Sequence, residues 1–172
     1  MTGEEIKEKV CGILDCAGIS YERVDHEAAY TMEDLNRMGL PHIETIAKNL
    51  FLRDSSGKHH FLVVVAGHRQ VDLKGLKKQI GSSRLSFASD ERLERYLGLT
   101  PGSVSALGVL NDEAGEVKLI FDQALREHPV IGVHPNINTA MLYLKLEDLE
   151  RFLTQHGHQP VWINMDETEG AE

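Results

Sequence analysis

The apolar run at residues 61–66 (FLVVVA) is the feature that most restricts what this chain can fold into. Its β-branched and aromatic side chains favour a strand, and the absence of polar alternation indicates that both faces of the strand are buried. A second apolar run, residues 50–53, precedes it across a polar connection at residues 54–60. We therefore predict that the two runs pair as a hairpin within the core.

Lys48 and Asn49 stand at the entrance to the first of these strands, directly before its apolar residues. Polar groups that a rigid scaffold presents at the end of a buried strand are well placed for binding, so both are candidate site residues. The alternative is structural: the Lys48 ammonium extends from the edge of the core into solvent, and Asn49 caps a local turn.

The length and composition predict a single globular domain. The chain has 172 residues, 41% of them hydrophobic and 26% charged, which is enough for one well-cored domain and short for two. We expect this domain to span residues 1–165, followed by an acidic tail at 166–172. Because there is neither an apolar run near ~18 residues nor a signal-peptide pattern, we expect a cytoplasmic protein without a membrane partner.

Hairpins interspersed with capped helices predict an α+β fold, with a mixed, mostly antiparallel sheet curled toward a barrel and flanking helices. Residues 107–110 and 117–121 are expected to form a second hairpin around a polar turn. Helices are predicted to begin after caps and to end near glycines, and further strands are short. The expected helix caps are Thr2, Thr31, Asp72 and Ser89, a last helix spans 146–155, and the further strands are 21–25, 85–88, 130–133, 139–144 and 161–164.

The charge distribution limits the nucleic-acid partners that the chain can have. A net charge of -9 argues against a protein that coats DNA or RNA without sequence preference. Residues 69–84 are nevertheless basic and include Arg69, Lys74 and Lys77. This stretch is either a local nucleic-acid contact on an acidic body or an ordinary solvated helix face.

Several common kinds of site are not indicated. The chain has no phosphate-binding glycine loop, no HExxH and no GxSxG, so we expect neither a nucleotide cofactor nor a catalytic serine triad. The histidines do not have metal-ligand spacing, and we predict no metal and no cofactor. Cys11 and Cys16 share one predicted helix and are expected to be reduced and structural.

Residues 132–136 (GVHPN) form a second candidate site element. Gly132 follows an apolar strand and lets the backbone approach a ligand, while Pro135 biases His134 toward extended geometry. The side chain of His134 and the neighbouring peptide groups could then face a shared pocket. The alternative is a plain corner between two strands with an exposed imidazole.

Taken together, the motifs resemble one family over nearly the whole chain: the YbaK-like aminoacyl-tRNA deacylases, or prolyl-tRNA editing domain family, and within it the freestanding alanyl-tRNA(Pro) deacylases. Several motifs in matching order are far more specific than any one alone. The matching pieces are AKNLFLR at 47–53, VDLK at 71–74, LSFAS at 85–89, LTPGSV at 99–104, GVHP at 132–135 with 138–139, and GHQP at 157–160.

The resemblance implies hydrolysis of the ester between a wrong amino acid, alanine in the freestanding branch, and the terminal adenosine of tRNA(Pro). It implies that Lys48 is the residue on which activity depends, holding the terminal phosphate or the developing oxyanion. It implies a substrate-binding role for a second set of residues, with His134 shaping the pocket or hydrogen bonding rather than acting as acid or base. That set is Asn49, Gly132, His134, Pro135 and Thr31.

The same resemblance implies that the acceptor end of tRNA(Pro) is the partner, contacted through phosphates by Arg69, Lys74 and Lys77, with transient contact with prolyl-tRNA synthetase. An activated ester needs no cofactor for hydrolysis. Three alternatives stay open at this stage. The chain could be a non-catalytic tRNA-binding or regulatory homologue, a deacylase for cysteine, serine or threonine, or a hydrolase of a small ester or amide unconnected to tRNA.

Overall fold

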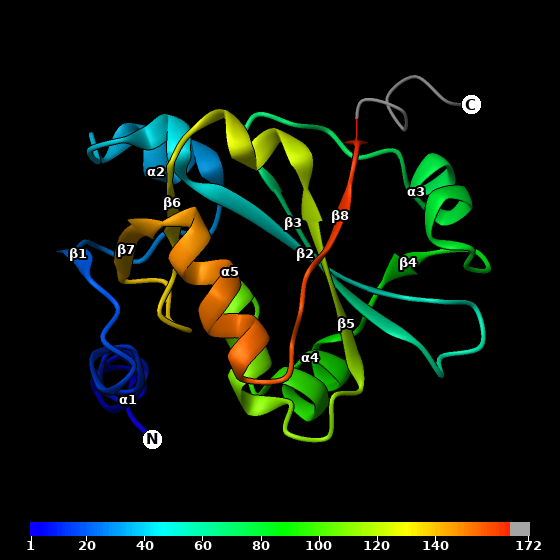
Figure 1. The fold of residues 1–172 in the computed structure, drawn as a ribbon, viewed down its shortest axis with the longest axis horizontal. Helices are drawn as coiled ribbons and strands as arrows, with labels where there is room; N and C mark the ends of the chain where they lie inside the picture. The colour runs from blue at the N-terminus through cyan, green and yellow to red at the C-terminus, as the bar shows by residue number, and fades with distance from the viewer. Residues whose placement is uncertain (166–172) are drawn as a thin grey trace.

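The structure is a computed structural model that describes residues 1–165, so the acidic tail predicted at 166–172 lies outside the described residues. Its strands form two sheets, one of five strands in the order β4-β2-β3-β5-β8 and one of three in the order β1-β7-β6. Helices cover these sheets, and the arrangement is the predicted single-domain α+β fold (Figure 1). The sheets do not close into a barrel.

The predicted hairpin of β2 (Ala47–Arg53) and β3 (His60–Ala66) is confirmed and forms the centre of the large sheet. Every residue of β3 is buried. Its side chains alternate between two hydrophobic clusters, with Leu62 and Val64 in one and Val63 and Val65 in the other. Both faces of this strand are therefore covered, as the unbroken apolar run predicts.

The predicted second hairpin is wrong. Residues Ala106–Asn111 form a 3-10 helix, η2, capped by the Ser105 hydroxyl, which accepts a hydrogen bond from the Leu107 amide at 3.1 Å. Strand β5 (Val117–Asp122) instead pairs in parallel with β3 and with β8 (Val161–Ile163). The periodicity of a short buried apolar run does not distinguish a strand from a helix. In this segment the Ser105 cap favours the helix.

The small sheet joins the large one close to Lys48. Strand β7 (Ala140–Lys145) pairs antiparallel with β1 (Tyr21–Asp25) and with β6 (Val130–Val133). A parallel bridge between Ile46 and Gly132 links β6 to the residue that precedes β2. The beginning of β2 and the end of β6 are thereby held side by side.

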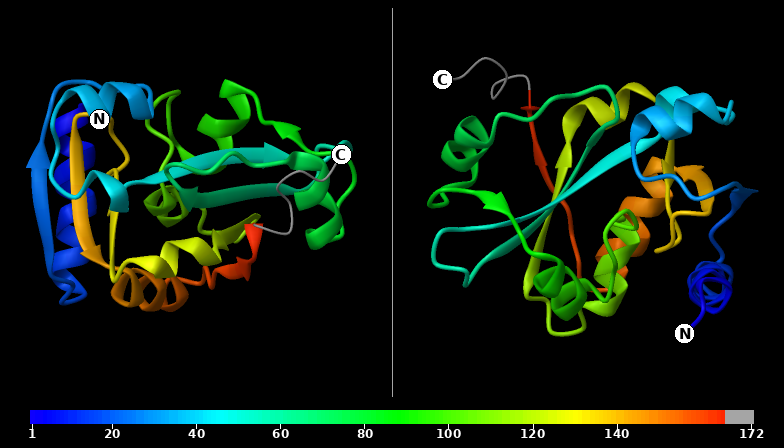
Figure 2. Two further views of the ribbon diagram at one scale, coloured as in Figure 1. Left: turned by 90° about the horizontal axis from the view of Figure 1, so that it is seen from above. Right: turned by 180° about the vertical axis from the view of Figure 1, so that it is seen from behind.

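The helices begin at the predicted caps and surround both sheets. Helix α1 (Gly3–Cys16) lies beside the small sheet, and α3 (Leu73–Ile80) lies at the opposite end of the molecule (Figures 1 and 2). Helices α1, α4 (Asp90–Leu97) and α5 (Leu146–Gln155) contribute to the largest hydrophobic cluster, and α3 packs on the second. The remaining elements are short: α2 (Met32–Arg37), η1 (Ile43–Thr45), β4 (Ser86–Phe87) and η3 (Gln123–Glu127).

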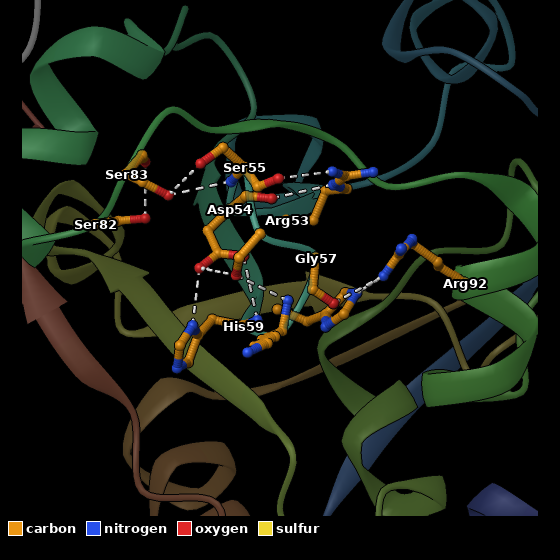
Figure 3. Close-up of polar contacts among 11 residues, drawn as sticks. Arg53, Asp54, Ser55, Gly57, His59, Ser82, Ser83 and Arg92 are labelled. Carbon is orange, nitrogen blue, oxygen red and sulfur yellow. Dashed lines mark hydrogen bonds and ion pairs between the residues drawn. The ribbon is translucent and has the colours of Figure 1, made fainter.

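The turn that closes the β2–β3 hairpin is built around the buried carboxylate of Asp54 (Figure 3). Ser56 Oγ donates to both carboxylate oxygens at 2.9 and 3.0 Å, and the amide and Nδ1 of His59 donate at 3.3 and 2.8 Å. Gly57 has φ +71°, the left-handed conformation that glycine adopts without strain. This end of the hairpin is closed by its own side chains.

Candidate active site

A cavity of about 620 Å³ opens at the other end of the hairpin, a volume typical of small-molecule sites. Five separate segments line it: the beginning of β2, the residues after β3, the segment leading into α2, the turn near position 102, and the residue after β6. The lining residues are Ala29, Tyr30, Thr31, Met32, Glu33, Leu35, Ala47, Lys48, Asn49, Gly67, His68, Arg69, Gln70, Gly102, Val104 and His134.

Lys48, the candidate residue at the beginning of β2, lines this cavity. Its side chain is partly buried, and its Nζ donates a hydrogen bond to the backbone carbonyl of Arg69 at 2.5 Å. Burial lowers the pKa of the ammonium below its ordinary value. An ammonium has three N–H donors, so the contact with Arg69 leaves two to face the cavity. Lys48 is thus held in place and not extended freely into solvent.

The expected contact of Arg69 with tRNA phosphates stays a prediction, and the structure shows another contact for its side chain. Its side chain is only 6% exposed, and Nε donates to Oδ2 of the buried Asp122 at 2.8 Å. The same carboxylate accepts a hydrogen bond from the amide of Ala66 and caps η3 through Ala124. Because a buried ion pair is costly to break, Arg69 serves to fix the segment whose carbonyl holds Lys48.

Asn49 and Thr31 both line the cavity, as their predicted substrate-binding role requires, but that role stays a prediction. The Oδ1 atom of Asn49 is buried and has no hydrogen-bond partner among the described residues. Thr31 Oγ1 accepts from the amide of Asp34 at 3.1 Å, and the Asp34 carboxylate accepts from the Thr31 amide in return. Thr31 therefore fixes the beginning of α2, whereas Asn49 offers an unused acceptor.

His134 also lines the cavity and is fixed on two sides. Its Nδ1 lies 3.0 Å from the carbonyl of Ala140, and its own carbonyl accepts from Ser105 Oγ at 2.5 Å. A carbonyl only accepts, so Nδ1 must carry the proton of the neutral ring, which leaves Nε2 as an acceptor. Burial lowers the pKa of the imidazole and favours this neutral form.

The other two loop residues, Gly132 and Pro135, are buried and lie outside the wall of this cavity. A β-carbon at position 132 would lie 3.0 Å from Ile46 Cγ1 and 3.1 Å from Tyr143 Cε1. Glycine therefore suits the close packing of Ile46 and Tyr143 at this position. The expected substrate-binding role of Gly132 and Pro135 stays a prediction.

Lys74 and Lys77 are on α3, with Lys74 exposed and Lys77 partly buried. Residues 67–70 line the cavity and lead through 71–72 into this helix, which lies at the opposite end of the molecule from α1 (Figure 1). Their contact with tRNA phosphate stays a prediction.

The sequence pattern gave no signal for Tyr30, which the structure places on the rim of the cavity. An aromatic residue directly before a capping box is typical of a hydrophobic staple that packs onto its own helix. Tyr30 is instead 69% exposed. The position of the Tyr30 side chain on the cavity therefore could not be predicted from the sequence.

Among residues 1–165, no helix is long and apolar enough to cross a membrane. Within the same residues, no group of three or more His, Cys, Asp or Glu side chains is arranged to hold a metal ion.

The fold and the site define the class of the protein. Residues 26–152 match the aminoacyl-tRNA editing domain family, and the chain belongs to it, as its motifs indicated. It is 44% identical over 154 residues to the prolyl-tRNA editing protein ProX of Acetoanaerobium sticklandii, covering 90% of this chain and 94% of that one.

More distant relatives cover the chain as fully. The prolyl-tRNA synthetase associated domain-containing protein 1 of Mus musculus is 33% identical over 174 residues, covering 96% of this chain and 100% of its own. A crystal structure described as a candidate trans-editing enzyme for prolyl-tRNA synthetase superposes with a TM-score of 0.71 at 19% identity, covering 95% of this chain and 98% of that one. This last match supports the fold alone.

Proposed function

We propose that this protein is a trans-editing hydrolase that cleaves the aminoacyl ester of mischarged tRNA(Pro), with alanyl-tRNA(Pro) as its preferred substrate. The observation that carries the proposal is the fixed, partly buried ammonium of Lys48 in a cavity shared with Asn49 and His134. The editing family to which the chain belongs, and the names of its relatives, support the same substrate class.

The proposed reaction is a simple hydrolysis. Water attacks the ester carbonyl carbon, negative charge develops on the carbonyl oxygen, and the bond to the ribose oxygen breaks. The ribose oxygen takes up a proton, and the products are the free amino acid and tRNA. A positioned ammonium stabilises the developing charge, or the terminal phosphate beside it, without reorganisation, and this is the role we assign to Lys48.

The two acceptors of the cavity complement this cation. Asn49 Oδ1 lacks a partner among the described residues, and His134 in its neutral form presents Nε2 as an acceptor. An aminoacyl group carries an ammonium donor next to its ester, and a water nucleophile also donates. We assign Asn49 and His134 to these donors, and we assign no general-base step to His134.

The need for such an enzyme follows from the size of the substrates. A synthetase pocket built for proline cannot exclude alanine sterically, and the missing methylenes are worth only about 1–3 kcal/mol. A second site that admits the smaller product is then required. We assign this second site to the cavity of about 620 Å³ that residues of α2 and β2 help to line.

Two partners belong to this proposal. The acceptor end of tRNA(Pro) would reach the cavity past the basic side chains of Lys74 and Lys77 on α3. The name of the mouse relative refers to a prolyl-tRNA synthetase associated domain, which supports transient contact with that enzyme.

A single-turnover deacylation panel tests the proposal. Purified protein is mixed with alanyl-, cysteinyl-, seryl-, threonyl- and prolyl-tRNA(Pro), and the Lys48→Ala variant serves as the matched control. We expect alanyl-tRNA(Pro) to be cleaved fastest and prolyl-tRNA(Pro) to be spared. Faster cleavage of another aminoacyl-tRNA would show that the preferred amino acid is not alanine. If none of the substrates is cleaved, the hydrolase proposal is wrong and the protein is a tRNA-binding homologue without activity.

A further inference from the structure

Tyr30 is an exposed aromatic side chain on the rim of the cavity that holds Lys48. Its side chain is 69% exposed, and among the large hydrophobic residues of the described chain only one other aromatic, Phe87, is exposed to a similar degree, at 64%. Phe87 pairs with Leu52 near the closed end of the hairpin, away from Lys48. The two residues therefore share their exposure but not their surroundings.

The ring of Tyr30 is held in position although it is exposed. A β-carbon at position 102 would lie 2.7 Å from its Cδ1 and 3.2 Å from its Cε1, so the ring rests against the backbone of Gly102. Gly102 has φ +86° and leaves room for the ring because it has no side chain. The rest of the ring surface is open to solvent at the mouth of the cavity.

The backbone around Tyr30 is fixed as well. Its amide donates to Asp34 Oδ2 at 2.9 Å, within the capping box that begins α2. The preceding residue, Ala29, is buried and donates its amide to the carbonyl of Asn138 at 3.1 Å. An exposed ring on a fixed backbone loses little freedom when a ligand binds, which is favourable for recognition.

We propose that Tyr30 is a stacking platform for the terminal base of the bound aminoacyl-tRNA. This inference rests on the proposed function, which puts the ester beside Lys48 and the nucleoside that carries it at the mouth of the cavity. Exposed aromatic rings that meet single-stranded RNA ends stack on their bases, and every base has a face that can stack. Tyr30 then orients the nucleotide, while Lys48 acts on its ester.

A fluorescent acceptor stem tests the contact directly. An uncharged tRNA(Pro) acceptor-stem RNA with 2-aminopurine as its terminal base reports stacking by quenching of its fluorescence. We expect the wild-type protein to quench it and Tyr30→Ala to lose the quenching and bind about 5- to 100-fold more weakly, which corresponds to about 1–3 kcal/mol of stacking at 1.4 kcal/mol per tenfold.

Two control variants define the outcome. Tyr30→Phe keeps the ring and should behave like the wild type, and Phe87→Ala removes an equally exposed ring elsewhere and should leave quenching and affinity unchanged. Absence of quenching with the wild-type protein, unchanged quenching in Tyr30→Ala, or equal losses in Tyr30→Phe and Tyr30→Ala would each overturn the proposal. Thermal unfolding of each variant checks that the fold is kept.

The test separates this inference from the proposed function, because the probe carries no ester. Quenching that depends on Tyr30, in a protein that cleaves no aminoacyl-tRNA, would refute the hydrolase and keep the stacking platform. Normal deacylation by Tyr30→Ala at every substrate concentration would refute the platform and keep the hydrolase. When both hold, Tyr30→Ala should need more substrate to reach half its maximal rate, with that maximal rate little changed.

Discussion

The two ends of the β2–β3 hairpin differ in how their polar groups are satisfied. At the closed end, both oxygens of Asp54 accept hydrogen bonds from Ser56 and His59 (Figure 3). At the open end, Asn49 Oδ1 is buried without a partner among the described residues, and Lys48 lines the cavity with one of its three donors used on the Arg69 carbonyl. Polar groups that neighbours satisfy stabilise the turn, whereas polar groups left facing a cavity are available to a ligand.

The charges at the two ends respond to burial in opposite ways. Burial of Asp54 favours the neutral acid, but hydrogen bonds from His59 and Ser56 outweigh it and hold the pKa of the carboxyl well below its usual range. Burial of Lys48 lowers the pKa of its ammonium, so its charge is disfavoured. The charge of Asp54 is already stabilised, and the charge of Lys48 would be stabilised by a bound anion.

The largest effect we expect is on the rate after Lys48→Ala. Removing a preorganised electrostatic contact should lower single-turnover deacylation by about 10²–10³, while thermal unfolding changes little. Lys48→Arg keeps the positive charge and should therefore retain part of the rate. It should not retain all of it, because a planar guanidinium cannot occupy the same point as the ammonium. A rate within a few-fold of the wild type would show that the open end of the hairpin is structural like the closed one.

Asp54→Asn should produce the opposite result: a loss of stability without a loss of rate. Weakening the charged hydrogen bonds of the turn should lower the free energy of unfolding by about 1–3 kcal/mol, measured by denaturant titration. The pKa of Asp54 is lower in the folded than in the unfolded chain. Its stabilising contribution is therefore fully present above the ordinary pKa of aspartate, about 3.9, and is lost as pH falls through the folded value.

The matched control is to follow the acid unfolding of Asp54→Asn, which should lack this part of the pH dependence. A clear fall in the deacylation rate of folded Asp54→Asn would contradict the division between the two ends.

The pH dependence of the rate should reveal the lowered pKa of Lys48. Only the ammonium stabilises negative charge, so the rate relative to uncatalysed hydrolysis should fall about tenfold per pH unit above the folded pKa, at a pH below the ordinary 10.5. Between the folded and the ordinary pKa, the unfolded chain binds more protons, so the free energy of unfolding should rise with pH.

Lys48→Arg is the control for this profile, because a guanidinium keeps its charge at alkaline pH. An identical alkaline fall in Lys48→Arg would assign the titration to another group.

The smallest effect concerns the basic helix α3. Lys74→Ala or Lys77→Ala should lower the slope of log affinity for tRNA against log salt by roughly one, with a weak effect on affinity at any single salt concentration. Lys9→Ala removes a charge from α1, at the far end of the molecule, and should leave the slope unchanged (Figure 1). Equal slopes for all three variants would place the tRNA elsewhere.

Local signals in the sequence were enough to predict much of this fold. The apolar run of β3 gave the hairpin, and the caps at Thr2, Thr31, Asp72 and Ser89 gave the helix starts. The 3-10 helix Ala106–Asn111 was missed, because an apolar run of that length fits either a strand or a buried helix.

The parts of the site that depend on distant contacts could not be predicted in this way. Arg69 has a basic neighbourhood in the sequence, but its partner Asp122 is 53 residues away. Gly132 meets Ile46 only because two sheets are joined, and the ring of Tyr30 lies against Gly102, which is distant from it in the sequence. Position at strand ends made Lys48, Asn49 and His134 candidates, family resemblance added their roles, and the structure places all three on one cavity.

The anchoring of Lys48 has a consequence for how such a protein can change its substrate. The lysine is tied through the Arg69 carbonyl and the Arg69–Asp122 pair to the central strands, whereas the facing wall belongs to the six-residue helix α2 and its capping box. Substitutions in α2 can resize the cavity without displacing the ammonium. Under the proposed function, selectivity for the amino acid and the power to cleave its ester could therefore diverge separately over evolutionary time.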